Sequence, residues 1–223
     1  MIIPAPLPEN YAHLERELRH VKDAVSRVQI DVVDGVFAPS TTWPYNNTDA
    51  SQWRALVAQE SGLPFWEVLD FEIDMMVDRP EEKIDDWINA GAETLIIHIE
   101  STDKLKELIE RASERGVEVA LALKPSTNIE LLAPWIERIA FVQCMGNDKI
   151  GYHGVSLDER IFDKIRTIRE RWPALAVGID IGVNEQTIGE LAKAGATRFA
   201  AGSAILSAED AEHAVQVLSR AME

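Results

Sequence analysis

The feature that most constrains this chain is an alternation of two kinds of segment along its whole length. Short apolar runs, rich in β-branched residues, occupy residues 2–4, 28–32, 68–76, 94–99, 117–123, 138–144, 176–180 and 198–201. They lack a regular in–out change of polarity, as expected of parallel strands that are buried on both faces. Amphipathic segments with helical spacing lie near residues 9–24, 51–60, 80–90, 102–115, 128–135, 157–171, 184–194 and 207–221.

Glycines at the boundaries between these segments support repeated strand–helix units. Gly91, Gly116 and Gly195 each stand where a helix must end and the chain must turn into a strand. Eight such units in 223 residues predict an α/β fold, a single-domain (β/α)8 barrel over residues 1–223. The alternative is a doubly wound open sheet, but the G-x-G-x-x-G turn expected after its first strand is absent from the sequence.

Composition restricts the possible partners and the compartment. The net charge of −16 and the pI near 4.7 argue against nucleic acid or an anionic membrane as a partner. The single cysteine, Cys144, excludes an internal disulfide framework. Residues 1–30 contain neither a secretion signal nor an apolar segment long enough to cross a bilayer. We therefore expect a cytoplasmic protein.

Acidic side chains follow several predicted strands, at the end where barrels of this kind carry their functional groups. Gln29 and Asp31 are two residues apart on one strand and therefore share a face. Asp74, His98 and Asp180 close three other strands. Carboxylates that converge at one mouth suit the transfer of a proton by two bases.

Glycines after the last two strands predict a second feature of the same mouth. Gly182 follows the seventh strand, and Gly202 with Ser203 follows the eighth. In this fold these loops commonly bind phosphate through backbone N–H groups, which need glycine for close approach. Such a site would let an acidic protein hold an anionic ligand; alternatively, the glycines serve the turns alone.

The motifs together resemble the ribulose-phosphate 3-epimerase family over nearly the whole chain. The family's pattern H-x-D-x-M-D-G-x-F-V-P is similar to Gln29-Ile30-Asp31-Val32-Val33-Asp34-Gly35-Val36-Phe37-Ala38-Pro39. Further matches are Asp74-Met75-Met76-Val77 with Pro80, Ala90-Gly91-Ala92, His98-Ile99-Glu100, Lys124-Pro125-Ser126-Thr127, Asp180-Ile181-Gly182-Val183 and Ala201-Gly202-Ser203-Ala204-Ile205.

This resemblance implies a TIM barrel of the ribulose-phosphate-binding type, without an organic cofactor, that inverts C3 of a pentulose phosphate through an enediolate. Asp31 and Asp180 match the two aspartates that exchange the proton and also ligate a divalent metal. The substrate-binding positions implied by the resemblance and by the loops are Met76, Met145, Gly151, Gly154, Gly182, Gly202 and Ser203. The resemblance also implies a homo-oligomer.

The departures from the family are concentrated at the site. Gln29 and Asp74 stand where the family has its two metal-ligating histidines, and Ala5 replaces a serine. If a metal still binds, the shell of Gln29, Asp31, Asp74 and Asp180 is all oxygen, which favours Mg²⁺ or Mn²⁺. Without a cation, at least one of the converging carboxylates should be protonated near neutral pH.

Alternatives remain open at this stage. Asp31 and Asp180 could be turn or capping residues, Asp74 a buried acid bonded to backbone amides, and His98 a structural histidine. The loop 150–155 differs from the family and contains His153, either an exposed residue or a new ligand contact. The chain could also be a catalytically silent sugar-phosphate binder. A hexulose-phosphate lyase of the same barrel group is disfavoured, because Glu72 stands where its D-x-K-x-x-D pattern needs lysine.

Overall fold

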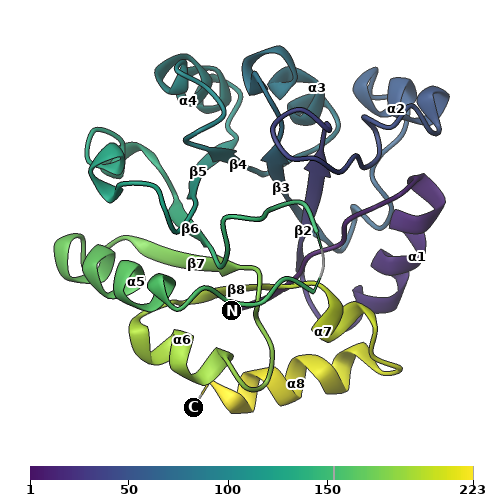
Figure 1. The fold of residues 1–223 in the computed structure, drawn as a ribbon. Helices are drawn as coiled ribbons and strands as arrows, with labels where there is room; N and C mark the ends of the chain where they lie inside the picture. Colours follow the sequence, from purple (N-terminus) through teal and green to yellow (C-terminus); the bar gives the residue numbers. More distant parts are fainter. Residues whose placement is uncertain (153, 223) are drawn as a thin grey trace.

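The computed structural model describes residues 1–152 and 154–222, and their backbone forms a nearly closed barrel of parallel strands (Figure 1). The hydrogen-bonded order is β1-β8-β7-β6-β5-β4-β3-β2. Between the ends of this order, the Asp31 N–H on β2 donates to the carbonyl of Pro6, two residues after β1, 2.9 Å away. The strands are β1 (Ile2–Pro4), β2 (Arg27–Val33), β3 (Asp70–Met76), β4 (Thr94–His98), β5 (Glu118–Leu123), β6 (Phe141–Met145), β7 (Ala176–Asp180) and β8 (Arg198–Ala201). The predicted barrel is confirmed, and the open-sheet alternative is wrong.

Helices surround the barrel in the order that the alternation predicts (Figure 1). They are α1 (Tyr11–Val21), α2 (Ala50–Val57), α3 (Ile84–Asn89), α4 (Leu105–Glu114), α5 (Arg160–Arg171), α6 (Ile188–Ala194), α7 (Ser203–Leu206) and α8 (Ala211–Ala221). The Asn10 and Asp210 side chains cap α1 and α8, because each accepts a hydrogen bond from a first-turn N–H. Within the described residues, no helix has both the length and the apolar character that a membrane span requires.

Three sequence-based boundaries are wrong. The helix predicted at 128–135 is instead two 3-10 turns, η2 (Ile129–Leu132) and η3 (Ile136–Arg138), with Pro134 between them. Pro134 has no N–H to donate and so interrupts a helix. The strand predicted from 138 therefore begins only at Phe141, and the strand predicted from 68 begins at Asp70.

Two further helix predictions differ from the structure. The segment 80–90 is a 3-10 turn, η1 (Pro80–Glu82), followed by α3. The segment 207–221 contains α8 from Ala211 onward, and the short α7 precedes it directly after β8. Because α7 begins at Ser203, the loop after the eighth strand is much shorter than the sequence suggested.

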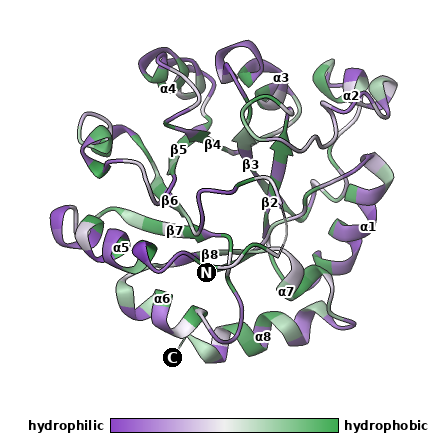
Figure 2. Cartoon of the chain, in the orientation of Figure 1, coloured by the Kyte–Doolittle hydropathy of each residue, from purple (hydrophilic) through white to green (hydrophobic). Residues whose placement is uncertain are grey.

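The apolar residues form two cores. One fills the layer between strands and helices, and Figure 2 shows hydrophobic residues along the strands and polar segments on the outer helices. The second lies inside the barrel and is composed of Val33, Ala38, Met76, Ile96, Ala120, Ala122, Phe141, Met145 and Ile150. This inner core supports the mouth of the barrel from below.

The connection from β6 to α5 crosses the mouth of the barrel toward β2 (Figure 1). Ile150 anchors it, because its side chain is buried in the inner core. The Ser40 hydroxyl donates to the Gly151 carbonyl at 2.5 Å. Gly151 has φ +83°, and a Cβ there would lie 2.8 Å from the Ser40 Oγ, so only glycine fits this crossing. The connection thereby roofs one side of a cavity.

Candidate active site

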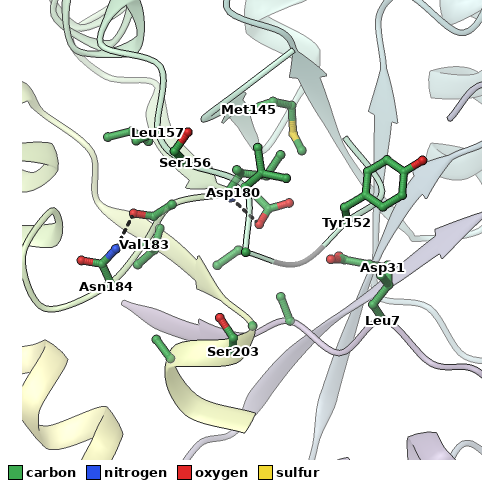
Figure 3. Close-up of a pocket in the computed structure, with 18 of the residues that line it drawn as sticks. Leu7, Asp31, Met145, Tyr152, Ser156, Leu157, Asp180, Val183, Asn184 and Ser203 are labelled. Carbon is green, nitrogen blue, oxygen red and sulfur yellow. Dashed lines mark hydrogen bonds between the residues drawn. The ribbon is translucent and has the colours of Figure 1, made fainter. Parts of the chain in front are cut away.

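A cavity of about 500 Å³ opens at the carboxyl ends of the strands, beneath the connection from β6 to α5 (Figure 3). Its walls come from the ends of β2, β6, β7 and β8 and from the loops that follow them. Every predicted catalytic and substrate-binding residue lines it, namely Asp31, Asp180, Met76, Met145, Gly151, Gly154, Gly182, Gly202 and Ser203. The structure thus brings these positions together, and their roles stay predictions.

Three carboxylates converge at this end of the barrel, and two of them, Asp31 and Asp180, line the cavity. Asp31, Asp74 and Asp180 each offer an oxygen atom, and these atoms lie within 4.8 Å of one another. Asp31 on β2 is in register with Asp74 on β3, while Asp180 ends β7. Asp31 and Asp180 are 7% exposed and Asp74 is fully buried. Figure 3 shows the Asp31 and Asp180 carboxyl groups facing the same space from two sides.

Burial and mutual repulsion alter the acidity of this group. Burial raises the pKa of Asp31 well above its usual range, and the charges of Asp180 and Asp74 raise it further. Burial, followed by the charge of Asp74, raises the pKa of Asp180 to about 7, although the Ile181 N–H donates to its carboxylate at 2.7 Å. A carboxyl group with a pKa near neutral, as at Asp180, can both give and take a proton at that pH, which two-base proton transfer requires.

Gln29 lies beside these acids and is fully buried. Its Nε2 donates to Asp31 Oδ1 at 2.8 Å, whereas its Oε1 has no hydrogen-bond partner among the described residues. A buried amide oxygen without a donor is costly unless something else satisfies it. The three converging carboxylates, with the unpartnered oxygen of the buried Gln29 beside Asp31, offer only oxygen atoms and so fit a hard divalent cation; Gln29, Asp31, Asp74 and Asp180 as its ligands stay a prediction.

Two side chains hold Asp74 in place. His98 Nε2 lies 3.0 Å from Asp74 Oδ1, and Gln143 Nε2 donates to Oδ2 at 3.2 Å. His98 is therefore a hydrogen-bonded buried histidine, and the partners of Asp74 are side chains. Sequence reasoning missed Gln143. It could have been found, because Gln143 precedes Met145 by two residues on one strand and must face the same interior.

The second acid of the β2 motif, Asp34, has a different environment. Its carboxylate accepts hydrogen bonds from the N–H groups of Val36 at 2.9 Å and Phe37 at 3.1 Å. Lys83 Nζ lies 2.7 Å from it. These partners lower the pKa of Asp34. The hydrogen bonds from Val36 and Phe37 show that Asp34 stabilises the turn that follows β2. Of the two acids in this motif, Asp31 alone lines the cavity.

One end of the cavity is formed by the loops after β7 and β8, where the glycines predict a phosphate site. Gly182 has φ +78°, and a Cβ there would lie 3.0 Å from the Leu157 side chain, so its place needs glycine. Its carbonyl accepts a hydrogen bond from the Thr187 hydroxyl at 2.6 Å. Thr187 and Asn184 also line the cavity and were missed by sequence reasoning. His153 lies outside the described residues.

The family model and the curated relatives that match this chain carry the same family name. The model of the "Ribulose-phosphate 3 epimerase family" matches residues 1–206. A ribulose-phosphate 3-epimerase of Schizosaccharomyces pombe is 32% identical over 97% of this chain and 91% of its own length. The relative from Oryza sativa, described as a cytoplasmic isoform of ribulose-phosphate 3-epimerase, is 28% identical over 100% of this chain and 94% of its own length.

Solved structures share the architecture. The structure of 3-hexulose-6-phosphate synthase from Salmonella typhimurium superimposes with a TM-score of 0.72, covering 99% of this chain and 97% of that chain. Its sequence is only 16% identical, so the similarity shows the fold alone.

Proposed function

This chain belongs to the ribulose-phosphate 3-epimerase family, and from that premise we propose that it interconverts D-ribulose 5-phosphate and D-xylulose 5-phosphate, or a closely related pair of ketose phosphates. The observation that carries the proposal is the placement of Asp31 and Asp180. They come from strands that are not neighbours, they are both buried, and they face one cavity. A carbon atom held between them is reachable from two sides.

The reaction follows from this placement. One aspartate, as a carboxylate, removes the proton from C3. The electron pair of the C3–H bond becomes the C2–C3 double bond of an enediolate, and the π pair of the C2 carbonyl moves to its oxygen. The other aspartate, as a carboxylic acid, gives its proton to the opposite face of C3, which inverts the configuration. The proton has moved from one carboxyl group to the other, and the reverse reaction exchanges their roles. The raised pKa values of Asp31 and Asp180 suit this exchange.

The remaining cavity residues would orient the sugar phosphate. Gly182, Gly202 and Ser203 would present backbone N–H groups to the phosphate, which requires no lysine or arginine from an acidic protein. Met76 and Met145 would pack against the carbon chain of the sugar, since both line the cavity from the inner core.

A divalent cation is part of the proposal. Gln29, Asp31, Asp74 and Asp180 would hold it, and their oxygen atoms favour Mg²⁺ or Mn²⁺. Such a cation would stabilise the negative charge of the enediolate oxygens. We also propose a cytoplasmic location, which the description of the Oryza sativa relative supports, and self-association, which rests on the family resemblance.

The experiment is a direct assay. The purified chain is incubated with D-ribulose 5-phosphate in the presence of Mg²⁺, Mn²⁺ or a chelator, and D-xylulose 5-phosphate is followed by NMR. We expect conversion with at least one of the two cations. Absence of conversion under every condition, with a panel of other ketose phosphates included, would remove the epimerase proposal.

A second candidate function is a sugar-phosphate binder without catalysis. The replacement of two histidine positions by Gln29 and Asp74 favours it, while the juxtaposition of Asp31 and Asp180 favours the enzyme. Thermal stabilisation by ketose phosphates without turnover would identify the binder. A lyase is disfavoured, because Glu72 occupies the position where lysine is needed and is itself paired with two arginines.

A further inference from the structure

His98 and Gln143 are two buried polar side chains that the proposed proton transfer does not use. They are 0% and 2% exposed and come from β4 and β6. Both reach the same group on β3: His98 Nε2 lies 3.0 Å from one oxygen of Asp74, and Gln143 Nε2 lies 3.2 Å from the other. Side chains from β4 and β6 thus both contact the Asp74 carboxylate.

The neighbouring positions leave room for these side chains. Ala122 on β5 is in register with both His98 and Gln143, and Gly178 on β7 is in register with Gln143. Residues in register on neighbouring parallel strands point to the same side of the sheet. Small residues beside the imidazole and the amide therefore let them extend inside the barrel to Asp74.

The hydrogen bonds fix the direction of the Asp74 carboxylate. Each of its oxygen atoms accepts one hydrogen bond, and a carboxylate oxygen can accept two. One lone pair on each oxygen thus remains available. Asp74 is in register with Asp31, and its oxygen lies within 4.8 Å of those of Asp31 and Asp180. No lysine or arginine among the described residues forms an ion pair with Asp74.

A separate observation points to a ligand at this position. The Gln29 side chain is fully buried beside Asp31, and its Oε1 has no hydrogen-bond partner in the described part of the chain. The Gln29 Oε1 and the ionised carboxylates of Asp31, Asp74 and Asp180 present only lone pairs, so a proton or a cation must complete the group. A divalent cation does so with every donor at once.

We propose that His98 and Gln143 are positioning residues of a divalent-cation site, and that they set its affinity by holding the Asp74 carboxylate toward Asp31 and Asp180. Residues that orient a metal ligand in this way typically change metal affinity by about 10- to 100-fold when they are replaced. The inference rests on the cation of the proposed function, but its test does not depend on turnover.

The experiment measures Mn²⁺ affinity by calorimetry and by electron paramagnetic resonance. Gln143→Leu removes one donor with little change in volume, and His98→Phe removes the other. His98→Gln is the matched variant that retains an amide donor. Cys144→Ala is the control for β6, because Cys144 is buried on the opposite face of that strand, in the outer core.

We expect the variants to fall into two groups. Gln143→Leu and His98→Phe should weaken Mn²⁺ binding about 10- to 100-fold, whereas His98→Gln and Cys144→Ala should bind like the wild type. In an Asp74→Asn background, Gln143→Leu should add no further loss, because Gln143 acts through Asp74. Melting temperatures in chelator separate this effect from a loss of folding.

Three outcomes would overturn the inference: a wild type that does not bind Mn²⁺, wild-type affinity in Gln143→Leu, or losses that multiply in the double variant. Epimerase activity of the wild type is measured in parallel. If the affinity pattern holds and the wild type does not epimerise, the proposed function fails and the inference stands. If the wild type epimerises and Gln143→Leu binds Mn²⁺ normally, only the inference fails.

Discussion

Buried acids are paired with arginine at one end of the barrel and are left without a cationic partner among the described residues at the other. At the amino end, Glu72 is fully buried, and its Oε1 is paired with Arg27 Nη1 at 3.0 Å and with Arg198. The Arg198 guanidinium also lies 3.9 Å from the centre of the Phe141 ring. At the carboxyl end, Asp31 and Asp180 share a cavity, and no described lysine or arginine is paired with either of them.

The difference separates structural acids from functional ones. A buried carboxylate that is paired with arginine is neutralised and serves the fold. The pKa values of Asp31 and Asp180 are raised first by burial and then by the charges of neighbouring aspartates. Such groups are expected where protons or cations are handled. The comparison therefore predicts that acids at one end control activity and the acid at the other controls stability.

The largest expected effect is on catalysis. Asp31→Asn and Asp180→Asn should each lower kcat by about 10²- to 10⁴-fold, the usual contribution of a general acid or base. Folding should be retained or improved, because each change removes a repulsive buried charge. Steady-state kinetics and chemical unfolding check the two parts. A kcat within threefold of the wild type for either variant would contradict the claim that the acids at the carboxyl end control activity.

The opposite end should show the opposite result. Glu72→Gln removes the charge that Arg27 and Arg198 share, and we expect unfolding to become easier by about 3 kcal/mol, the lower end for a broken buried pair because both arginines are partly exposed. The kcat of the remaining folded protein should be unchanged. Urea unfolding and kinetics on the same sample check this, and a catalytic defect without lost stability would argue against it.

The pH dependence of stability should also differ between the ends. The pKa of Asp180 is about 7 in the folded chain against an ordinary value of 3.8, so the folded state binds more protons than the unfolded state between these values. The stability from Asp180 is therefore present below about pH 4 and is lost as the pH rises through 7.

Asp180→Asn should remove part of this loss. In chelator, the free energy of unfolding of the wild type should fall between pH 4 and pH 8 more than that of the variant. Urea titrations at several pH values measure the two slopes. Equal slopes would show that Asp180 titrates normally in the folded protein.

The smallest effect is expected at Asp34, where position in the β2 motif can be separated from pairing with a cation. Asp34 lies in the same β2 motif as Asp31, but it is paired with Lys83 at 2.7 Å. Asp34→Asn should lower stability by about 1.5 kcal/mol through weaker hydrogen bonds to a charged partner, and leave kcat within a factor of a few. A catalytic loss as large as that of Asp31→Asn would mean that position in the motif outweighs pairing.

The barrel was predictable from the sequence, because strand runs and glycine turns repeat at regular intervals. Part of the cavity lining was predicted from strand ends, glycine turns and the family resemblance, whereas Asn184 and Thr187 were missed. The failures have local causes. Pro134 broke a segment with helical periodicity, and the start of β6 at Phe141 was obscured by the preceding apolar residues. Such boundaries depend on hydrogen bonds that polarity alone does not encode.

The inner arrangement of the site was less predictable. Asp31 and Asp180 were found from their strand ends and motifs, whereas Gln143 stood unnoticed in an otherwise apolar strand. The partnership of His98, Gln143 and Asp74 joins residues up to 69 positions apart, and only the register of the strands reveals it. The same limit applies to the pairing of Glu72 with Arg198, which are 126 positions apart.

The central claim is that Asp31 and Asp180 exchange the C3 proton from opposite faces of one sugar phosphate. The most direct measurement is deuterium incorporation at C3 in D₂O, followed separately for D-ribulose 5-phosphate and D-xylulose 5-phosphate. Asp31→Asn should label one of the two epimers, Asp180→Asn the other, and neither variant should interconvert them. If both variants label the same epimer, or if either interconverts the two at the wild-type rate, the two-face account is contradicted.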